Sequence, residues 1–268
     1  MKKGFIILTT IVILFLVSAC DKQLTSSVIT TEAPVIVEIT REEKILLDNT
    51  VDEFKMYTLT TNVPGPTIFI VGGTHGDEVA GYLAATELLN YDFKKGKIII
   101  VPKLNTVAIE QNVRYSKQDG YQDLNRAFPG NEKGTKTELI AKALYDEIKK
   151  ANPDYMFDMH ESRNNWKVPP YLGDSLIAHT ASGNDFVGFL GSDVVETYNA
   201  NRDRNDSAFT LLNEPVKGSL NRTVSEDLLI PVFTIETNRK LELERRIIQQ
   251  KQIASIILEK IWELPDDN

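Results

Sequence analysis

Cysteine and histidine are scarce in this chain of 268 residues, which contains one cysteine and three histidines. A single cysteine cannot form an intramolecular disulfide, and any metal site has only three imidazoles to draw on. Positive charge is also short, because 30 Lys and Arg stand against 38 Asp and Glu and give a net charge of -8. A surface of that sign repels polyphosphates, so nucleic-acid binding is not expected.

The composition excludes a disordered or low-complexity chain. Hydrophobic residues make up 42% of the sequence and charged residues 25%, as in ordinary globular enzymes. At about 150 residues per domain, the length allows one large or two small domains with a sizeable core.

The first twenty residues are predicted to be a secretory signal and not part of the fold. Two lysines precede an apolar run over residues 5–17, which at about thirteen residues is short for a membrane-spanning helix. The run ends in VSAC at 17–20. This ending resembles the bacterial lipobox, in which a peptidase cleaves before the cysteine and requires small residues ahead of it.

Cys20 is therefore expected to carry a lipid. A thioether-linked diacylglycerol supplies two acyl chains, enough for stable membrane attachment. We expect a signal peptide over residues 1–19, a Ser- and Thr-rich tether over 20–33 and a folded domain over 34–268. The protein would then be extracytoplasmic, anchored to the bacterial cell membrane as a lipoprotein. A signal anchor with an incidental cysteine is the alternative.

Strands alternate with helices along the rest of the chain. Residues 34–40 and 54–61 alternate apolar and polar side chains, as half-buried or edge strands do, and are expected to form a first hairpin or sheet edge. Short apolar runs predict further strands at 67–71, 97–101, 154–159 and 231–235. Helices are expected at 78–89, after a capping box at Thr135 and Glu138, at 184–200 and at 241–263. This alternation predicts a single α/β domain whose sheet is covered on both faces.

Three of the predicted strands end in residues that could build a metal site. The first leads into GGTHGDE with His75 and Glu78, the second into His160 and the third into Glu236. Ligands of open α/β sheets bind beyond the carboxyl ends of the strands, so these side chains are expected to meet. Two histidines and one carboxylate would leave one coordination position open for water, the arrangement of catalytic zinc. Iron or manganese would fit the same donors.

Five motifs in this order resemble the succinylglutamate desuccinylase and aspartoacylase family, a branch of the zinc carboxypeptidase superfamily. The motifs are GGTHGDE at 72–78, VPKLNTVAIEQNVRY at 101–115, DLNRAFPG at 123–130, DMHES at 158–162 and TIETN at 234–238. The resemblance implies a three-layer αβα sandwich with a mixed central sheet, like that of zinc carboxypeptidases, forming a hydrolase domain over 34–268. It also implies one Zn²⁺ per chain, held by His75, Glu78 and His160.

The resemblance assigns further roles. Glu236 matches the glutamate that deprotonates the attacking water and later protonates the leaving amine, and a carboxylate beside zinc suits that task. Arg114 matches the arginine that supports the developing oxyanion, and Asn125 with Arg126 matches the pair that holds a substrate carboxylate. A guanidinium suits both tasks because its planar fork makes bidentate, charge-assisted hydrogen bonds. The chain ends soon after the strand that precedes Glu236, so we expect the small C-terminal β domain of many relatives to be missing.

Some of these residues have a plainer interpretation. Glu78 could be a first-turn carboxylate favoured by the helix dipole. Glu236 could form half of a surface ion pair with Arg239, and Arg126 could only brace the turn that follows it.

Other residues near the motifs leave two interpretations open. Asp158 lies two residues before His160 on the same strand face, where it either orients a ligand or pairs within the core. His179 lacks a partner motif, which favours a surface or pocket-rim position. The loop that carries Trp166, Pro169, Pro170 and Tyr171 either lines the pocket or packs ordinarily.

The leading hypothesis is a membrane-tethered, zinc-dependent deacylase that hydrolyses amide bonds in a small, carboxylate-bearing substrate. One alternative is a metallocarboxypeptidase that acts on peptide or cell-wall stem-peptide ends. Another is a non-catalytic binding lipoprotein, although a metal scavenger has no need of Glu236 and would be expected to carry a His-rich tract. The sequence does not indicate an oligomeric state.

Overall fold

The structure, a computed structural model, describes residues 37–116, 120, 122–164, 172–179 and 185–264. Residues Val37–Asn268 form one compact unit. The expected signal peptide, Cys20 and the tether lie outside the described residues and stay predictions. None of the helices in the described part of the chain combines the length and apolar character that crossing a membrane requires.

Eight strands form one mixed sheet in the order β1-β2-β4-β3-β5-β8-β6-β7. The central strands β4, β3, β5 and β8 run parallel to one another, whereas β1, β2 and β6 pair antiparallel with their neighbours β2, β4 and β8. Strand β7 pairs parallel with β6 at one edge. The strands are β1 Ile39–Leu46, β2 Phe54–Thr61, β3 Thr67–Gly72, β4 Lys97–Val101, β5 Tyr155–Ser162, β6 Ser175–His179, β7 Thr210–Leu212 and β8 Val232–Asn238.

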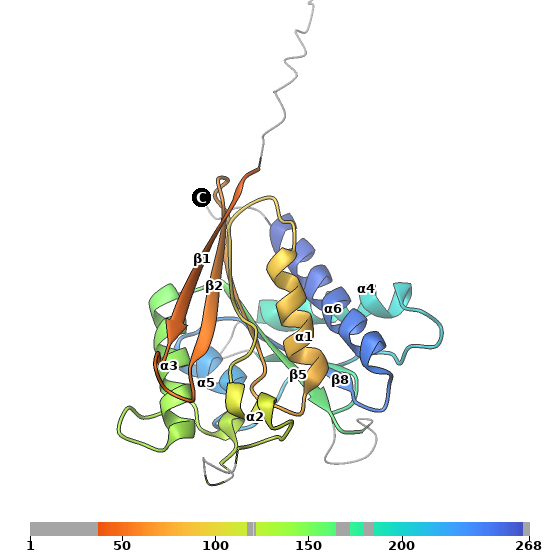
Figure 1. The fold of residues 1–268 in the computed structure, drawn as a ribbon. Helices are drawn as coiled ribbons and strands as arrows, with labels where there is room; N and C mark the ends of the chain where they lie inside the picture. Colours follow the sequence, from red (N-terminus) through yellow and green to blue (C-terminus); the bar gives the residue numbers. More distant parts are fainter. Residues whose placement is uncertain (1–36, 117–119, 121, 165–171, 180–184, 265–268) are drawn as a thin grey trace, which may run out of the picture. The chain divides into compact units, whose positions relative to one another are not determined.

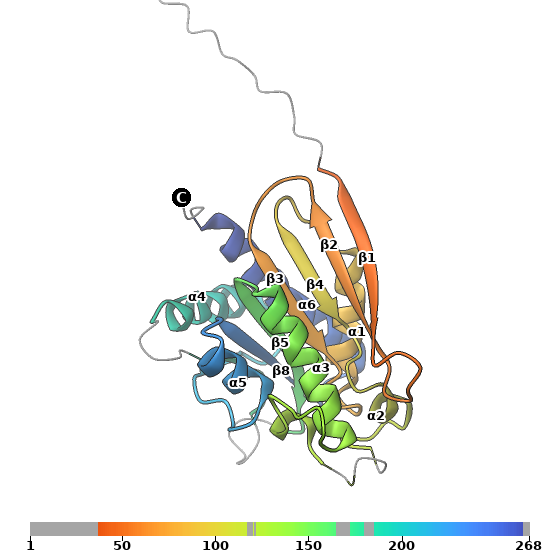
Figure 2. The same ribbon diagram turned by 90° about the vertical axis from the view of Figure 1, so that its left-hand side faces the viewer.

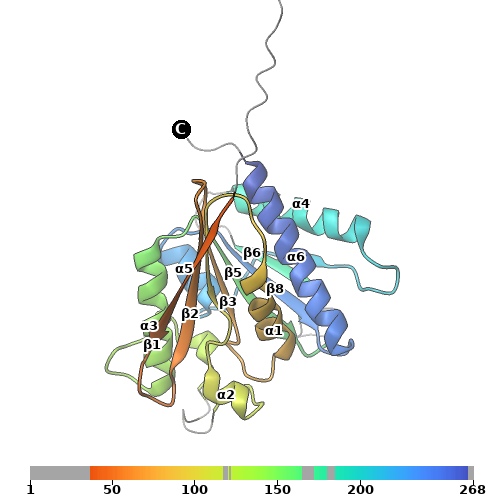
Figure 3. The same ribbon diagram turned by 45° about the horizontal axis from the view of Figure 1, so that its top comes forward.

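Helices cover both faces of the sheet (Figures 1 and 2). One face packs against α1 (Val79–Glu87), α4 (Asp185–Asn201) and α6 (Leu243–Glu263). The other packs against α3 (Lys136–Ala151) and α5 (Leu220–Asp227). Figure 3 shows the sheet between these two helix layers. The predicted αβα sandwich with a mixed central sheet is therefore confirmed.

Alternation of side chains along the central strands builds the two cores. Ile68 and Ile70 of β3 are fully buried in the core beneath α1 and α6, whereas Phe69 and Val71 are fully buried in the core beneath α3. Successive side chains thus point to opposite faces, but all of them are apolar because helices cover both faces of these strands. This explains why they could be recognised as short, continuous apolar runs.

Most predicted elements lie where the pattern placed them. Strand β4 has the predicted bounds, and α3 begins after Thr135, which forms the predicted capping box with Glu138. The crossover helix ends earlier than expected, at Glu87, and is followed by the 3-10 turn η1 (Leu88–Asn90).

The prediction of a strand at residues 34–40 was wrong in its position. The strand that pairs with β2 is Ile39–Leu46, and residues 34–36 lie outside the described part of the chain. All but the last of its eight side chains are exposed. A charged edge strand carries little hydrophobic periodicity, so the prediction relied on the apolar residues before it and placed the strand too close to the N-terminus. The expected hairpin at a sheet edge is confirmed.

Several short elements escaped prediction. They are β6, β7, α5, the single-turn helix α2 (Thr106–Glu110) and the 3-10 turn η3 (Leu124–Arg126). Each is eight residues or shorter, which leaves too few positions for a periodic pattern to emerge.

Strands β5 and β8 extend further than predicted, and the extension places the expected site residues. Their parallel pairing continues to Ser162 and Asn238 and sets His160 opposite Glu236. Both residues therefore lie within strands and not just after them, with side chains on the same face of the sheet.

Helix α1 lies directly against β5. A Cβ atom on Gly81 would be 2.5 Å from the carbonyl oxygen of Met159, so only glycine permits this approach. The approach brings the turn before α1, which carries Glu78, to the end of β5.

Candidate functional site

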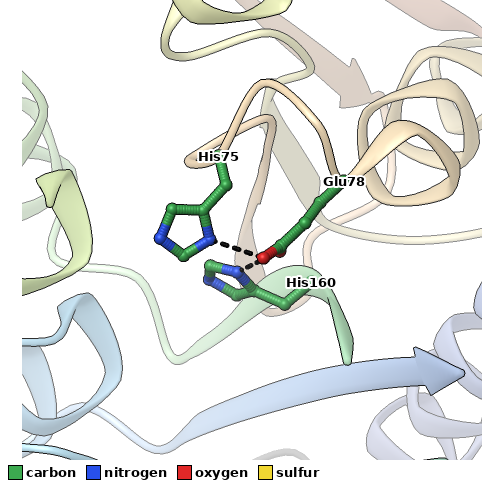
Figure 4. A group of neighbouring side chains, drawn as sticks. All are labelled: His75, Glu78 and His160. Carbon is green, nitrogen blue, oxygen red and sulfur yellow. Dashed lines mark hydrogen bonds and ion pairs between the residues drawn. The ribbon is translucent and has the colours of Figure 1, made fainter. Parts of the chain in front are cut away.

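Two histidines and one glutamate from distant segments meet at the carboxyl ends of β3 and β5. His75 and Glu78 come from the turn between β3 and α1, and His160 comes from β5. One ligand atom from each lies within 4.8 Å of the other two, and all three residues are buried. Figure 4 shows both imidazoles facing the Glu78 carboxylate. The Nδ1 atoms of His75 and His160 lie 2.8 Å from Oε1 and Oε2 of Glu78, respectively.

A second carboxylate lies behind each imidazole. Nε2 of His75 is 2.9 Å from Oδ1 of Asp123, and Nε2 of His160 is 2.9 Å from Oδ2 of Asp158. Such carboxylates fix the ring orientation and tautomer of metal-binding histidines and leave the other nitrogen for the metal. Of the two interpretations of Asp158, the one in which it orients a ligand matches this contact.

Asp123 was not singled out from the sequence. It opens the DLNRAFPG motif, and that position was the available signal. Burial raises the pKa of Asp123, but the hydrogen bond and charge of His75, with Arg114, outweigh burial and hold this pKa well below its usual value. The side chain thus stays ionised as the partner of the His75 ring.

The cluster has the properties of a divalent-cation site. His75 Nδ1 is buried and, among the described residues, has no hydrogen-bond partner, because its short contact with Glu78 lacks hydrogen-bond geometry. Burial raises the pKa of Glu78, but the two imidazoles outweigh that effect and hold the pKa well below its usual value. An ionised carboxylate and two directed ring nitrogens are donors that zinc accepts. The plainer interpretation of Glu78 as a first-turn carboxylate does not account for these contacts.

Glu236 lies beside this cluster on the neighbouring strand, opposite His160, and only 8% of its surface is exposed. Burial raises the pKa of Glu236 to about 8. The alternative pairing with Arg239 is not what the structure contains, because the Arg239 guanidinium donates instead to Oδ2 of Asp77 at 3.0 Å. Glu236 borders the same cavity as the three candidate ligands.

The predicted arginines and asparagine also border this cavity. Arg114 donates to Oε1 of Glu78 at 2.8 Å, so the guanidinium lies against the candidate ligands. Asn125 accepts a hydrogen bond from the backbone N–H of Leu220 at 2.9 Å, and its Nδ2 lies 3.4 Å from Nε2 of His160. The side chain of Arg126 is exposed and donates to the carbonyl oxygen of Asn125. This contact lies before the turn at residues 127–130 and not within it.

The cavity has a volume of about 290 Å³. Arg163, which the sequence did not single out, also borders it. His179 lies outside it at the end of β6, where its Nδ1 is 3.1 Å from the carbonyl oxygen of Asn213. Trp166, Pro169, Pro170 and Tyr171 lie outside the described residues, so the two interpretations of that loop stay open.

A family model extends the match beyond the motifs. Residues 64–255 match the catalytic domain of succinylglutamate desuccinylase and aspartoacylase, which is well over half of the chain. The chain belongs to the succinylglutamate desuccinylase/aspartoacylase family. The ligand candidates, Glu236 and the three polar residues at 114, 125 and 126 all lie within the matched region.

Two relatives of known activity match shorter segments. An N-alpha-acetyl-L-2,4-diaminobutyric acid deacetylase from Halomonas elongata is 33% identical over 123 residues, 45% of this chain and 35% of that enzyme. An N-acyl-aromatic-L-amino acid amidohydrolase from Xenopus tropicalis is 28% identical over 129 residues, 43% of this chain and 40% of that enzyme. Both names describe hydrolysis of an amide bond. The chain spans less than half of the length of either relative.

Solved structures show the same fold at low identity. A succinylglutamate desuccinylase from a Silicibacter species has a TM-score of 0.62 and 21% identity, with 88% of this chain and 73% of that chain covered. The cell shape determinant protein Csd4 from Helicobacter pylori has a TM-score of 0.68 and 21% identity, with 86% of this chain and 56% of that chain covered.

Metal affinity is expected to rise with pH. Burial lowers the pKa of His160, but Asp158 and Glu78 outweigh burial and hold this pKa well above its usual value of 6.5. A metal binds only the neutral imidazole, so it must displace this proton at lower pH. The dissociation constant for Zn²⁺ should therefore keep falling above pH 6.5, with release of about one proton per ion. Calorimetry in two buffers of different ionisation enthalpy measures both quantities.

The variant Asp158→Asn tests whether the proton on His160 causes this pH dependence. Loss of this carboxylate should lower the pKa of His160 and move the pH dependence to lower pH. An affinity that is independent of pH, without proton release, would contradict the prediction.

Proposed function

We propose that this protein is a zinc-dependent hydrolase of amide bonds that acts on a small substrate with a free carboxylate. We further propose that a lipid on Cys20 anchors it outside the cytoplasmic membrane. The convergence of His75, Glu78 and His160 beside Glu236 on one cavity is the observation that carries the catalytic part of this proposal. The lipobox-like ending of the N-terminal apolar run carries the anchoring part.

Glu236 is the proposed acid and base. A zinc ion held by His75, Glu78 and His160 would polarise the amide carbonyl and make water more acidic. The carboxylate of Glu236 accepts a proton from the attacking water and returns it to the nitrogen of the leaving amine. Its burial, which raises the pKa to about 8, favours proton uptake.

Arg114 is the proposed support for negative charge on the carbonyl oxygen of the substrate. Its guanidinium borders the cavity and already donates to a ligand candidate, Glu78. A second contact, from its Nη2 to Oδ2 of Asp123 at 3.3 Å, holds the plane of the guanidinium. A donor held in place before the reaction does not need to reorganise as charge develops.

Two exposed guanidinium groups support a substrate with a carboxylate. Arg126 borders the cavity and donates to a backbone oxygen, and Arg163 borders the same cavity with its Nη2 atom 3.7 Å from Oδ2 of Asp77. Asp77 is already paired more closely with Arg239. Both cations therefore retain donors for an anionic group in the cavity, although the whole chain is acidic.

A metallocarboxypeptidase is the second candidate, and the likeness to Csd4 favours it. Csd4 from Helicobacter pylori is described as a D,L-carboxypeptidase, and structures of it hold mDAP or a tripeptide. Cell-wall stem-peptide ends would be within reach of an extracytoplasmic lipoprotein. The deacylase assignment takes precedence because the relatives with the higher sequence identity are a deacetylase and an amidohydrolase.

Replacing Glu236 by Gln is expected to abolish turnover while metal binding persists. Loss of a general acid and base lowers kcat by about 10²- to 10⁴-fold, and the three ligand side chains remain. Turnover of an N-acetyl amino acid and metal content by elemental analysis are measured on the same preparation. Unchanged turnover would refute the role of Glu236, and a protein that binds but never hydrolyses would be the non-catalytic lipoprotein.

A screen of N-acyl amino acids against peptides separates the two enzymatic candidates and tests Arg126. Arg126→Ala should raise KM for substrates with a free carboxylate by about 10- to 100-fold, the cost of a charge-assisted hydrogen bond. Arg222→Ala is the control, because that exposed arginine pairs with Glu226 on α5. Equal rates on substrates with free and amidated carboxylates would exclude the proposed carboxylate contact.

A Cys20→Ser variant is expected to release the protein from the membrane fraction or to leave its signal peptide uncleaved. The hydroxyl of serine cannot accept the thioether-linked lipid that would hold the chain. Fractionation of cells and the mass of the mature N-terminus measure the outcome. An unmodified Cys20 in membrane-bound wild-type protein would argue for the signal anchor.

A further inference from the structure

A buried polar network lies on the face of the sheet opposite the side chain of His160. It joins α6, the end of β5 and the start of α1, which lie together on that face (Figures 1 and 3). Its members are Gln250 and Arg246 of α6, Glu161 of β5 and Thr237 of β8. The side chains of Gln250, Glu161 and Thr237 are almost entirely inaccessible to solvent.

The network holds the peptide group that follows His160. The carbonyl oxygen of His160 accepts a hydrogen bond of 2.6 Å from Nε2 of Gln250. The N–H of the same peptide group belongs to Glu161 and donates to Oε2 of Glu78 at 3.0 Å. Because the C=O and N–H of a trans peptide point in opposite directions, this unit is held between α6 and a candidate ligand.

The side chain of Glu161 fixes the second segment. One carboxylate oxygen accepts from the backbone N–H of Ala80 at 2.9 Å, and the other pairs closely with Arg246. Ala80 lies two residues after Glu78. Glu161 thus binds the Glu78 carboxylate through its backbone and the start of α1 through its side chain.

We infer that Gln250, Glu161 and Arg246 are positioning residues that set the separation between Glu78 and His160, and thereby the geometry of the metal site. The inference rests on the proposed function, because it requires that these residues bind a metal. Strand β3 ends at Gly72, opposite Met159, so no neighbouring strand on that side holds the next peptide group of β5. On that side the Glu78 carboxylate accepts from the N–H of Glu161 instead, and on the opposite side Gln250 donates to the carbonyl oxygen of His160.

Packing alone does not require the charged members. Helix α6 already buries Ile253, Ile257 and Leu258 against the core. A buried ion pair can be replaced by apolar side chains without loss of stability in many proteins. We therefore assign the Glu161–Arg246 pair to positioning Glu78 relative to His160, in addition to attaching α6 to the sheet.

Gln250→Met and its matched control, Gln249→Met, test the inference. Both glutamines are fully buried on α6, and each has an unpaired Oε1 among the described residues, but Gln249 donates to the Tyr198 hydroxyl, away from the site. The full mature protein is titrated with Co²⁺ and Zn²⁺, with the visible absorption of Co²⁺ as a report on ligand geometry. We expect Gln250→Met to weaken binding by about 10- to 100-fold and to alter the Co²⁺ spectrum, while Gln249→Met leaves both unchanged.

Glu161→Gln combined with Arg246→Met provides a second test that does not leave a buried charge unpaired. The double variant is expected to keep a melting temperature close to that of Gln249→Met but to bind Co²⁺ as weakly as Gln250→Met. Wild-type affinity and spectrum in both site variants would overturn the inference, as would equal weakening in the Gln249 control. Failure of the proposed function is distinguishable, because then the unaltered protein itself would not bind either metal tightly.

Discussion

The carboxylate of Glu78, held between two imidazoles in the interior, is the interaction on which the rest of the site depends. A buried carboxylate is unfavourable unless hydrogen bonds and opposite charge compensate its lost hydration. Here His75, His160, Arg114 and the N–H of Glu161 all approach its two oxygens. Each of these partners comes from a segment that must be held in place for the compensation to occur. The contacts that compensate the buried charge of Glu78 therefore also hold the three candidate ligands in the positions that a divalent cation would need.

The imidazoles next to the Glu78 carboxylate are themselves followed by further carboxylates. Asp123 and Asp158 lie behind the imidazoles, so each ring is fixed by an anion on one side and directed towards Glu78 on the other. Glu161 and Arg246 compensate each other on the far face of the sheet. Glu236 lies opposite His160, and its burial outweighs the charges of His160 and Arg114 and raises its pKa to about 8. Burial thus favours the protonated form of Glu236, whereas Glu78 and Asp123, whose pKa values are lowered, stay ionised.

The sheet topology determines what can meet. Parallel strands β3, β5 and β8 are neighbours, so the residues at their carboxyl ends gather at one end of the sheet. The same fold occurs in the solved structures of a succinylglutamate desuccinylase and of the D,L-carboxypeptidase Csd4. A fold by itself does not specify an activity, so the chemistry has to be argued from the residues at the site and the substrate from the walls of the cavity. In this chain those walls carry the guanidinium groups of Arg114, Arg126 and Arg163.

The sequence by itself determined the central strands, the start of α3, the candidate ligand residues and the family motifs, because these features are expressed in neighbouring residues. Apolar runs, a capping box and short motifs express their physics within a few positions. Only the tertiary structure decided the partners of those residues. Asp123 lies 48 positions from His75, and Arg246 lies 85 positions from Glu161. The charged edge strand β1 was misplaced for a related reason: its pairing with β2 stabilises it, and its own side chains carry no buried pattern. Contacts of that range follow from the order of strands in the sheet, which no local pattern encodes.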